Sequence, residues 1–176
     1  EFVAELLGFE GVLENTMDAV SSRDFALELL SSLAVMMTHG SRLCEELVVW
    51  SSGFARFVEL DDAFCSTSSI MPQKKNPDTA EVMRAKAGSV LGSATAAFTI
   101  AKALPLSYNR DLQELNPHLW RGISDAKHST RLLVDMLSSA TFNVAVMAEE
   151  AGRGYSTATD VADMLVQSHG FPFRTA

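Results

Sequence analysis

A short polar stretch carries the residue types that could remove a proton from a carbon next to a carboxylate. Its chemistry-bearing members are two serines, two lysines and a helix-start pattern: Ser68, Ser69, Lys74, Lys75 and Asn76-Pro77-Asp78. A serine is a weak base, because its hydroxyl is hardly ionised near neutral pH. It becomes useful where positive charge stabilises the alkoxide and water is excluded. Such a stretch suits a substrate with several carboxylates.

Positive charge beside the serines is expected from Lys74, from Lys75 and from the amino end of the helix that follows. A helix amino end acts as about half a positive charge. The same field would stabilise a carbanion whose charge spreads onto a neighbouring carboxylate, a charge that develops only in the transition state. The alternative interpretation is a Ser-rich loop that caps a helix and carries two solvated lysines.

Long helices are expected to hold this loop in place. The chain of 176 residues is 47% hydrophobic and has five prolines, a composition that favours helices over strands. Apolar residues that recur every three or four positions predict helices over residues 23–50, 76–104, 117–142, 146–151 and 157–169. We therefore predict an all-α fold, a bundle of long helices.

Particular residues predict the ends and faces of these helices. Asn76 is expected to cap a helix whose first residue is Pro77, and Pro117 is expected to begin the next long helix. Residues 9–22 are expected to be irregular. The buried face of the helix over residues 23–50 is predicted to consist of Phe25, Leu29, Leu33, Met36, Gly40, Leu43 and Leu47.

Composition excludes several classes of function. The net charge of −8 argues against a nucleic-acid surface, and no apolar run approaches the roughly 20 residues of a membrane span. Cys44 and Cys65 are isolated, which is typical of reduced thiols in a cytosolic protein. The four histidines lie too far apart for a metal-binding helix. We therefore predict no metal, no cofactor, no nucleic acid and no membrane partner.

Three motifs give the chain a resemblance to a known family. The string Ser68–Asp78 resembles the signature of the fumarase/aspartase superfamily of helical lyases, and residues 73–78 are similar to the argininosuccinate lyase family in particular. The segments Met17–Phe25 and Tyr108–Glu114 agree with that family and follow its order. The resemblance implies a fumarase/aspartase-type bundle and a homotetramer with active sites shared by three subunits. It also implies cleavage of argininosuccinate to arginine and fumarate in the cytoplasm.

The resemblance further implies roles for individual residues. Ser68 would be the base that takes the proton from carbon, and Lys74 and Asn76 would hold the succinyl carboxylate and the developing aci-carboxylate. Tyr108 and Gln113 would bind the arginine half. The other implied substrate-binding residues are Ser69 and Arg23.

The resemblance also divides the chain and implies that other segments exist. Residues 1–142 would form the later part of a central helical-bundle domain, with the catalytic loop at 61–76, and residues 143–176 would begin a C-terminal helical domain. The chain starts at Glu1, not Met, and is expected to be a piece of a longer protein. The family's general-acid histidine would lie upstream of Glu1, since none of the four histidines here stands in the matching motif.

Two positions depart from the family pattern. Thr67 stands where many relatives have glycine before the two serines, a change that would stiffen the loop. Asn116 stands where many relatives carry a lysine that helps to hold the substrate. One contact to the arginine half is therefore not expected from this position, although Arg110 nearby could compensate.

Two other functions remain open at this point. Another lyase of the superfamily would act on adenylosuccinate, malate or aspartate, and the Gln73-Lys74-Lys75 spelling argues against it. A non-catalytic helical oligomer would keep only the scaffold, as lens crystallins of this family do. The intact set of Ser68, Lys74 and Asn76 disfavours that second alternative.

Overall fold

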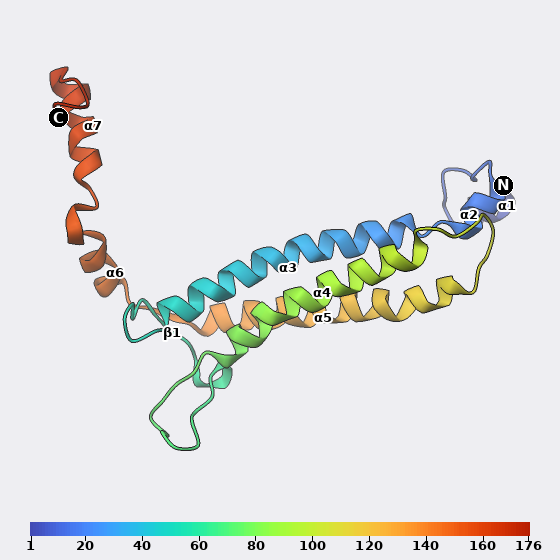
Figure 1. Cartoon of the computed structure of the whole chain (residues 1–176), viewed down its shortest axis with the longest axis horizontal. Helices are drawn as coiled ribbons and strands as arrows, with labels where there is room; N and C mark the ends of the chain where they lie inside the picture. The colour runs from blue at the N-terminus through green and yellow to red at the C-terminus, as the bar shows by residue number, and fades with distance from the viewer.

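Three long antiparallel helices form the body of the molecule. The computed structural model describes residues 1–176, and its long helices are α3 (Asp24–Trp50), α4 (Asp78–Ala101) and α5 (Asp111–Ser139). They lie side by side and reverse direction from one to the next (Figure 1). The predicted all-α fold is confirmed. None of the helices combines the length and the apolar character that crossing a membrane would require.

Helix α4 lies between the other two and presents small side chains to both. Its buried residues are Ala80, Met83, Val90, Ser93, Ala94 and Ala97. Small residues at a helix contact let the axes approach closely, so ridges of larger side chains from the neighbours fill the space. Leu30 of α3 and Leu115 of α5 do so at one end, and Leu47 of α3 and Met136 of α5 at the other. The core is therefore a narrow column along the whole bundle.

The predicted buried face of α3 is mostly wrong: Leu47 is buried and Leu33 and Gly40 are partly buried, but the other four residues are exposed. The side chains that the chain buries are Ala26, Leu30, Ala34, Met37, Cys44 and Leu47, whereas Phe25 remains 67% exposed and Leu29 41% exposed. Helix α3 is apolar around much of its circumference, and α4 and α5 cover the stripe that contains two alanines. The stripe of larger residues lies beside it and is left uncovered within this chain.

Both proline-based helix starts are displaced by the structure. Helix α4 begins at Asp78, Pro77 occupies the cap position, and the Asn76 side chain makes no cap hydrogen bond. Helix α5 begins at Asp111, six residues before Pro117, which lies inside it. A proline inside a helix has no N–H to donate, so the carbonyl of Gln113 loses its usual partner. The remaining backbone bonds and the packing of α5 keep the helix continuous.

Short elements flank the bundle. The segment predicted to be irregular contains α2 (Thr16–Ser21), which forms because the Asn15 side chain accepts a 3.2 Å hydrogen bond from the Asp18 amide. Helix α1 is Phe2–Leu6. Strands β1 (Val58–Glu59) and β2 (Thr141–Phe142) pair antiparallel, so residues 141–142 are not part of the long helix. The 3₁₀ turns η1 and η2 are Asp62–Phe64 and Arg153–Tyr155.

The last part of the chain leaves the bundle as a separate arm. Helices α6 (Val144–Ala151) and α7 (Ala158–His169) extend away from the three long helices (Figure 1). Both were predicted, with starts displaced by two residues and one residue. Gly170 ends α7 in a left-handed conformation with φ 69°, which glycine adopts without strain. Neither helix buries a residue.

Candidate active site

The polar loop is closed at its base by its own backbone. The Asn76 amide donates to the Ser66 carbonyl at 2.9 Å, and the Ser66 amide donates to the Asn76 carbonyl at 3.0 Å. The Asn76 side-chain amide adds a 3.3 Å bond to the same Ser66 oxygen. Residues 67–75 therefore project from the end of the bundle where α4 begins (Figure 1).

Inside the loop, two local hydrogen bonds order the backbone. The Ser68 hydroxyl oxygen accepts from the Ile70 amide at 3.3 Å, and the Lys74 amide donates to the Met71 carbonyl at 3.0 Å. Ser68 is half-buried, whereas Ser69 and Lys74 are exposed. The Ser68 hydroxyl donates to no protein group, and Lys74 forms no ion pair. Both side chains are free to meet a ligand.

Lys75 does not add the free positive charge expected of it. Its ammonium group lies 2.6 Å from the Asp62 carboxylate and 3.4 Å from that of Glu59. The hydrogen bond to Asp62 is the largest of the influences that raise the pKa of Lys75 above its ordinary value. The helix end is also partly offset, because Asp78 lies in the first turn of α4. Lys74 is therefore the one unpaired lysine of the loop.

The other candidate residues lie where α3 and α5 begin. The Gln113 side-chain amide donates a 2.8 Å hydrogen bond to the Tyr108 hydroxyl. The Arg23 guanidinium donates to the carbonyls of Val20 and Ser22 at 3.1 and 2.6 Å, which leaves its other N–H groups unused. This end thus offers a phenol, an amide and a guanidinium for polar contacts.

One backbone bond joins the two motifs at this end. The Ser107 amide donates to the Met17 carbonyl at 3.0 Å, so the segment before α5 is tied to α2. Ser107 has a φ of 76°, an uncommon conformation for a residue other than glycine, and it turns the chain toward α5.

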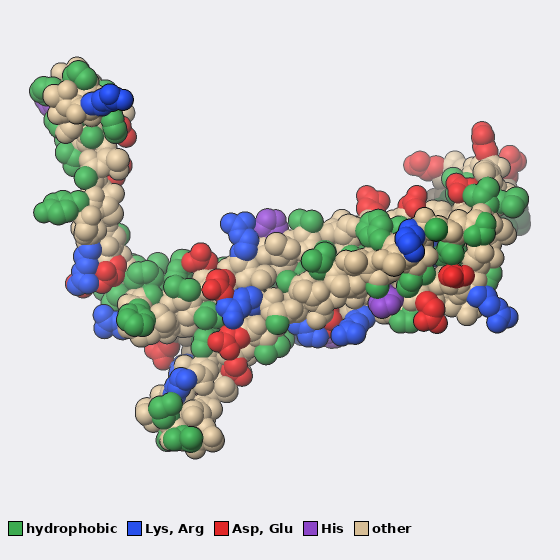
Figure 2. Space-filling model, viewed as in Figure 1, with side chains coloured by type: hydrophobic (Ala, Val, Ile, Leu, Met, Phe, Trp, Pro, Cys, Tyr) green, Lys and Arg blue, Asp and Glu red, His purple; other side chains and the backbone are tan.

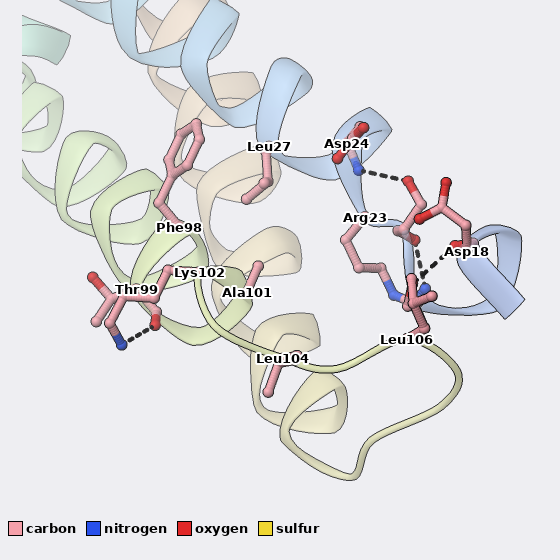
Figure 3. A pocket seen from close by; sticks show the side chains of 12 residues that line it. Asp18, Arg23, Asp24, Leu27, Phe98, Thr99, Ala101, Lys102, Leu104 and Leu106 are labelled. Atoms are coloured by element: carbon pink, nitrogen blue, oxygen red, sulfur yellow. Dashed lines mark hydrogen bonds between the residues drawn. The ribbon is translucent and has the colours of Figure 1, made fainter.

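Beside Arg23 is a cavity of about 480 Å³. Its lining mixes polar and apolar side chains: Leu106 lies beside Asp18 and Arg23, while Phe98 lies on the α4 side of the cavity (Figure 3). Three separate segments form it: the α2–α3 junction, the carboxyl end of α4 and the connection to α5. The sequence motifs include Asp18 and Arg23 but give no sign that Phe98 and Leu106 would join them.

The candidate residues therefore form two groups at opposite ends of the bundle. Ser68, Lys74 and Asn76 precede α4, and Arg23 and Tyr108 lie beyond its other end (Figure 1). Helix α4 has 24 residues, so at 1.5 Å per residue the groups are about 36 Å apart. A single copy of the chain does not bring all of these residues into one site.

A bundle of long helices with polar motifs at both ends is the arrangement expected of a helical lyase. Comparison with known proteins identifies the family. A family model described as Lyase matches residues 1–92, slightly more than half of the chain. The chain belongs to this lyase family, and the resemblance to fumarase/aspartase-type lyases that the motifs indicated is confirmed.

The particular relatives it matches are argininosuccinate lyases. The chain is 65% identical over 175 residues to that of Methanoculleus marisnigri, which covers 99% of this chain and 36% of the relative. It is 67% identical over 156 residues to that of Methanosphaerula palustris, which covers 89% of this chain and 32% of the relative. The chain thus spans about a third of the length of these curated relatives.

Solved structures have the same arrangement of helices. A crystal structure of EDDS lyase in complex with formate superposes with a TM-score of 0.81 at 33% identity and covers 96% of this chain and 33% of that one. A class II fumarase from Schistosoma mansoni superposes with a TM-score of 0.76 at 20% identity, covering 97% of this chain and 38% of the other. At that lower identity the likeness concerns the fold alone.

Proposed function

We propose that this chain is part of an argininosuccinate lyase, an enzyme of arginine biosynthesis that cleaves argininosuccinate to arginine and fumarate. The observation that carries the proposal is the 65% identity over 175 residues to a protein of that name. The loop with Ser68 and Lys74 adds a chemical reason, since it combines a hydroxyl with an unpaired cation. The two free thiols fit a cytoplasmic setting.

The proposed reaction is a β-elimination. Ser68 Oγ removes the proton from the carbon beside a carboxylate of the succinyl half, and the electron pair moves onto that carboxylate. Lys74 and Asn76 hold the resulting aci-carboxylate, with Ser69 as a further contact, because charge that develops there needs donors already in place. The electron pair then forms the double bond of fumarate while the carbon–nitrogen bond breaks.

The arginine half leaves with the electrons of the broken bond. Its guanidino nitrogen takes a proton from a general acid, which we propose lies in a segment other than residues 1–176. Tyr108 and Gln113 bind this half through their hydroxyl and amide groups, and Arg23 lies near the substrate. These residues would position the leaving group while the loop handles the succinyl half.

We propose that each active site draws residues from several subunits of a homotetramer. The 36 Å length of α4 keeps the loop of one chain away from its own Tyr108 (about 1.5 Å per residue). A neighbouring subunit that packs antiparallel would bring its opposite end to that loop. The uncovered apolar side chains along α3, such as Phe25, Leu29 and Met36, give such a neighbour a surface to bury, and apolar groups lie exposed along the bundle (Figure 2).

We further propose that residues 1–142 belong to the central helical domain and residues 143–176 begin a second one. The support is that α6 and α7 leave the bundle and bury nothing against it. An arm of this kind needs further chain or another subunit to cover its apolar residues, among them Val144 and Val161.

The test of the proposed activity is the Ser68→Ala variant of the intact protein, followed by fumarate absorbance. Removal of a general base lowers the turnover by about 10²- to 10⁴-fold. The exposed serine Ser138 on α5 supplies the control, because Ser138→Ala should keep wild-type turnover. Undiminished cleavage by Ser68→Ala would reject Ser68 as the base.

A second candidate is a related carbon–nitrogen lyase that acts on a different substrate. The structural match to EDDS lyase at 33% identity favours keeping this alternative. A panel of argininosuccinate, adenylosuccinate, aspartate, malate and EDDS would separate the two. Cleavage of any of these but not of argininosuccinate would overturn the first proposal, and cleavage of none would favour a scaffold role.

A further inference from the structure

We propose that Lys75 is a positioning residue that fixes the base of the catalytic loop and does not touch the substrate. This inference rests on the proposed function for its effect on turnover, but the contacts that carry it are independent of the substrate. The Lys75 ammonium group lies between two carboxylates, 2.6 Å from Asp62 and 3.4 Å from Glu59. Both partners precede residues 67–75, the part of the loop that projects from the bundle, and Lys75 stands where that part returns.

The two carboxylates belong to segments that are themselves held in place. Glu59 lies on β1 and pairs with Thr141 of β2. Its sequence neighbours Val58 and Leu60 have buried side chains, which fix this segment to the bundle. Asp62 lies in the η1 turn, where the neighbouring Asp61 carboxylate accepts a 2.8 Å bond from the Ala63 amide. Lys75 is therefore anchored to β1 and η1 and not to residues 67–74 of the projecting part of the loop.

A second interaction at the base of the loop, a backbone bridge, lies directly beside the Lys75 ion pairs. The backbone bridge between Ser66 and Asn76 closes the loop one residue after Lys75. Between these interactions and the loop tip there are only the two local bonds at Ser68 and Lys74. The direction in which the tip leaves the bundle, and with it the place of the Ser68 hydroxyl, is consequently set at the base.

The charges separate the roles of the two adjacent lysines. Two carboxylates face the single charge of Lys75 and occupy two of the three N–H donors of its ammonium group, so little net positive charge remains there for a substrate carboxylate. Lys74 has no such partner and can bind an anion directly. The two adjacent lysines thus have different roles: Lys74 binds the substrate carboxylate, and Lys75 positions the loop that carries Lys74.

The test compares Lys75→Met, Lys75→Arg and Lys74→Met in the intact protein. Lys75→Met should lower kcat by about 3- to 20-fold, the range that two exposed ion pairs supply, while KM stays within about twofold, since only a transition-state arrangement is lost. Lys75→Arg keeps the charge and should restore most of kcat. Lys74→Met should lower kcat by about 10²-fold or more.

Hydrogen exchange of residues 66–76 without substrate provides a readout that does not depend on activity. Lys75→Met and the double variant Glu59→Gln/Asp62→Asn should both speed exchange at the Ser66 and Asn76 amides, whereas Lys74→Met should not. The double variant also serves if Lys75→Met fails to fold.

Two results would overturn the inference. One is unchanged exchange and unchanged kcat in Lys75→Met. The other is a rise in KM as large as that of Lys74→Met, which would mean that Lys75 contacts the substrate. If the wild-type protein does not cleave argininosuccinate, the proposed function fails, while the exchange comparison still decides whether Lys75 holds the loop.

Discussion

Gly122 of α5 lies directly against the side chain of Leu30 on α3. A β-carbon built on Gly122 would fall within 3.0 Å of Leu30 Cδ2 and 3.5 Å from Ser93 Cβ of α4. Leu30 is completely buried, so its side chain could make room only by repacking within the core. The missing side chain at Gly122 is therefore what lets all three long helices meet at one level of the bundle.

Gly122→Ala should destabilise the protein despite the better helix propensity of alanine. Overpacking of a tight core costs about 1–3 kcal/mol, and alanine returns about 1 kcal/mol in a helix interior. The matched control is Gly40→Ala on α3, whose β-carbon would lie 3.9 Å from Leu133 in ordinary contact. That variant should gain about 0.5–1 kcal/mol. Urea unfolding of both variants measures the difference, and a stabilised Gly122→Ala would contradict the packing.

A half-buried ion pair links α4 to α5, and removing one of its two partners is expected to destabilise the protein more than removing the other. The Lys86 ammonium group lies 2.8 Å from Asp125 Oδ1, and the Asp125 side chain is 17% exposed against 40% for Lys86. The other oxygen of Asp125 is buried without a hydrogen-bond partner. Removing Lys86 leaves a poorly hydrated carboxylate whose remaining cation is Arg121, with Nε 3.9 Å from Asp125 Oδ2 and beyond hydrogen-bond distance. Removing the Asp125 charge leaves an ammonium group that water can reach.

Lys86→Met should therefore destabilise the protein more than Asp125→Asn does. A mostly buried charged group that loses its only hydrogen-bond partner costs about 1–3 kcal/mol, and the distant Arg121 offsets part of this, so we expect about 2 kcal/mol for Lys86→Met. For Asp125→Asn we expect about 1 kcal/mol. The exposed pair of Arg153 and Glu149 is the control, because Arg153→Met should change stability by less than about 0.5 kcal/mol. Equal effects of Lys86→Met and Arg153→Met in urea unfolding would show that the Asp125 carboxylate is solvated.

The long helices could be predicted from the sequence because apolar spacing over many turns is a strong signal. Their buried faces could not, and neither could the start of α5, although the predicted starts of α3 and α4 lie within one and two residues of those in the structure. On α3 two apolar stripes compete, and the contacts of α4 and α5 decide which one is covered. At α5, Pro117 has the local preference of a first helical residue, but packing of Leu112 and Leu115 extends the helix backward past it.

The candidate site shows the same division between local and tertiary information. The residue types of the loop and the motif at Tyr108 are readable from the chain itself. Their separation by the length of α4 is visible only once the helices are placed side by side. The pairing of Lys75 with Asp62 was also missed, since a residue 13 positions earlier gives no local sign of proximity.

Thiol chemistry should distinguish the two cysteines. Burial is the main cause that raises the pKa of both thiols above the ordinary 9.0, and Arg84 near Cys44 and Lys75 near Cys65 only partly oppose it. At pH 8 both should react slowly with iodoacetamide because little thiolate forms. Cys65 is partly exposed and should react first, whereas Cys44 is 1% exposed and should wait for unfolding.

The same shifts predict how stability depends on alkaline pH. In the unfolded chain the Cys44 thiol ionises near pH 9.0, whereas in the folded protein it keeps its proton to a higher pH. The free energy of unfolding is therefore unaffected by this thiol below pH 9 and falls as the pH rises from there through the folded pKa. The free energy of unfolding of Cys44→Ala, measured with urea, should therefore fall less above pH 9 than that of the wild type. Mass spectrometry follows the alkylation, and equal rates for Cys44 in folded and urea-unfolded protein would contradict its burial.

Mixing two inactive variants tests whether the opposite ends of the bundle meet between subunits. One carries Ser68→Ala, and the other carries Tyr108→Phe with Gln113→Ala, at the far end of α4. If each site takes its loop from one subunit and its Tyr108 end from another, random exchange leaves about a quarter of the sites with both native ends. Fumarate formation should then rise to about a quarter of the wild-type rate after the variants are unfolded and refolded together.

The matched control mixes Ser68→Ala with Lys74→Met. Both defects lie in the same loop, so no combination of subunits restores a site. No recovery in the first mixture would mean that Ser68 and Tyr108 act within a single chain or at different sites. Recovery in the control would mean that Ser68 and Lys74 of one site come from different chains, so either result would reject the proposed division of the site.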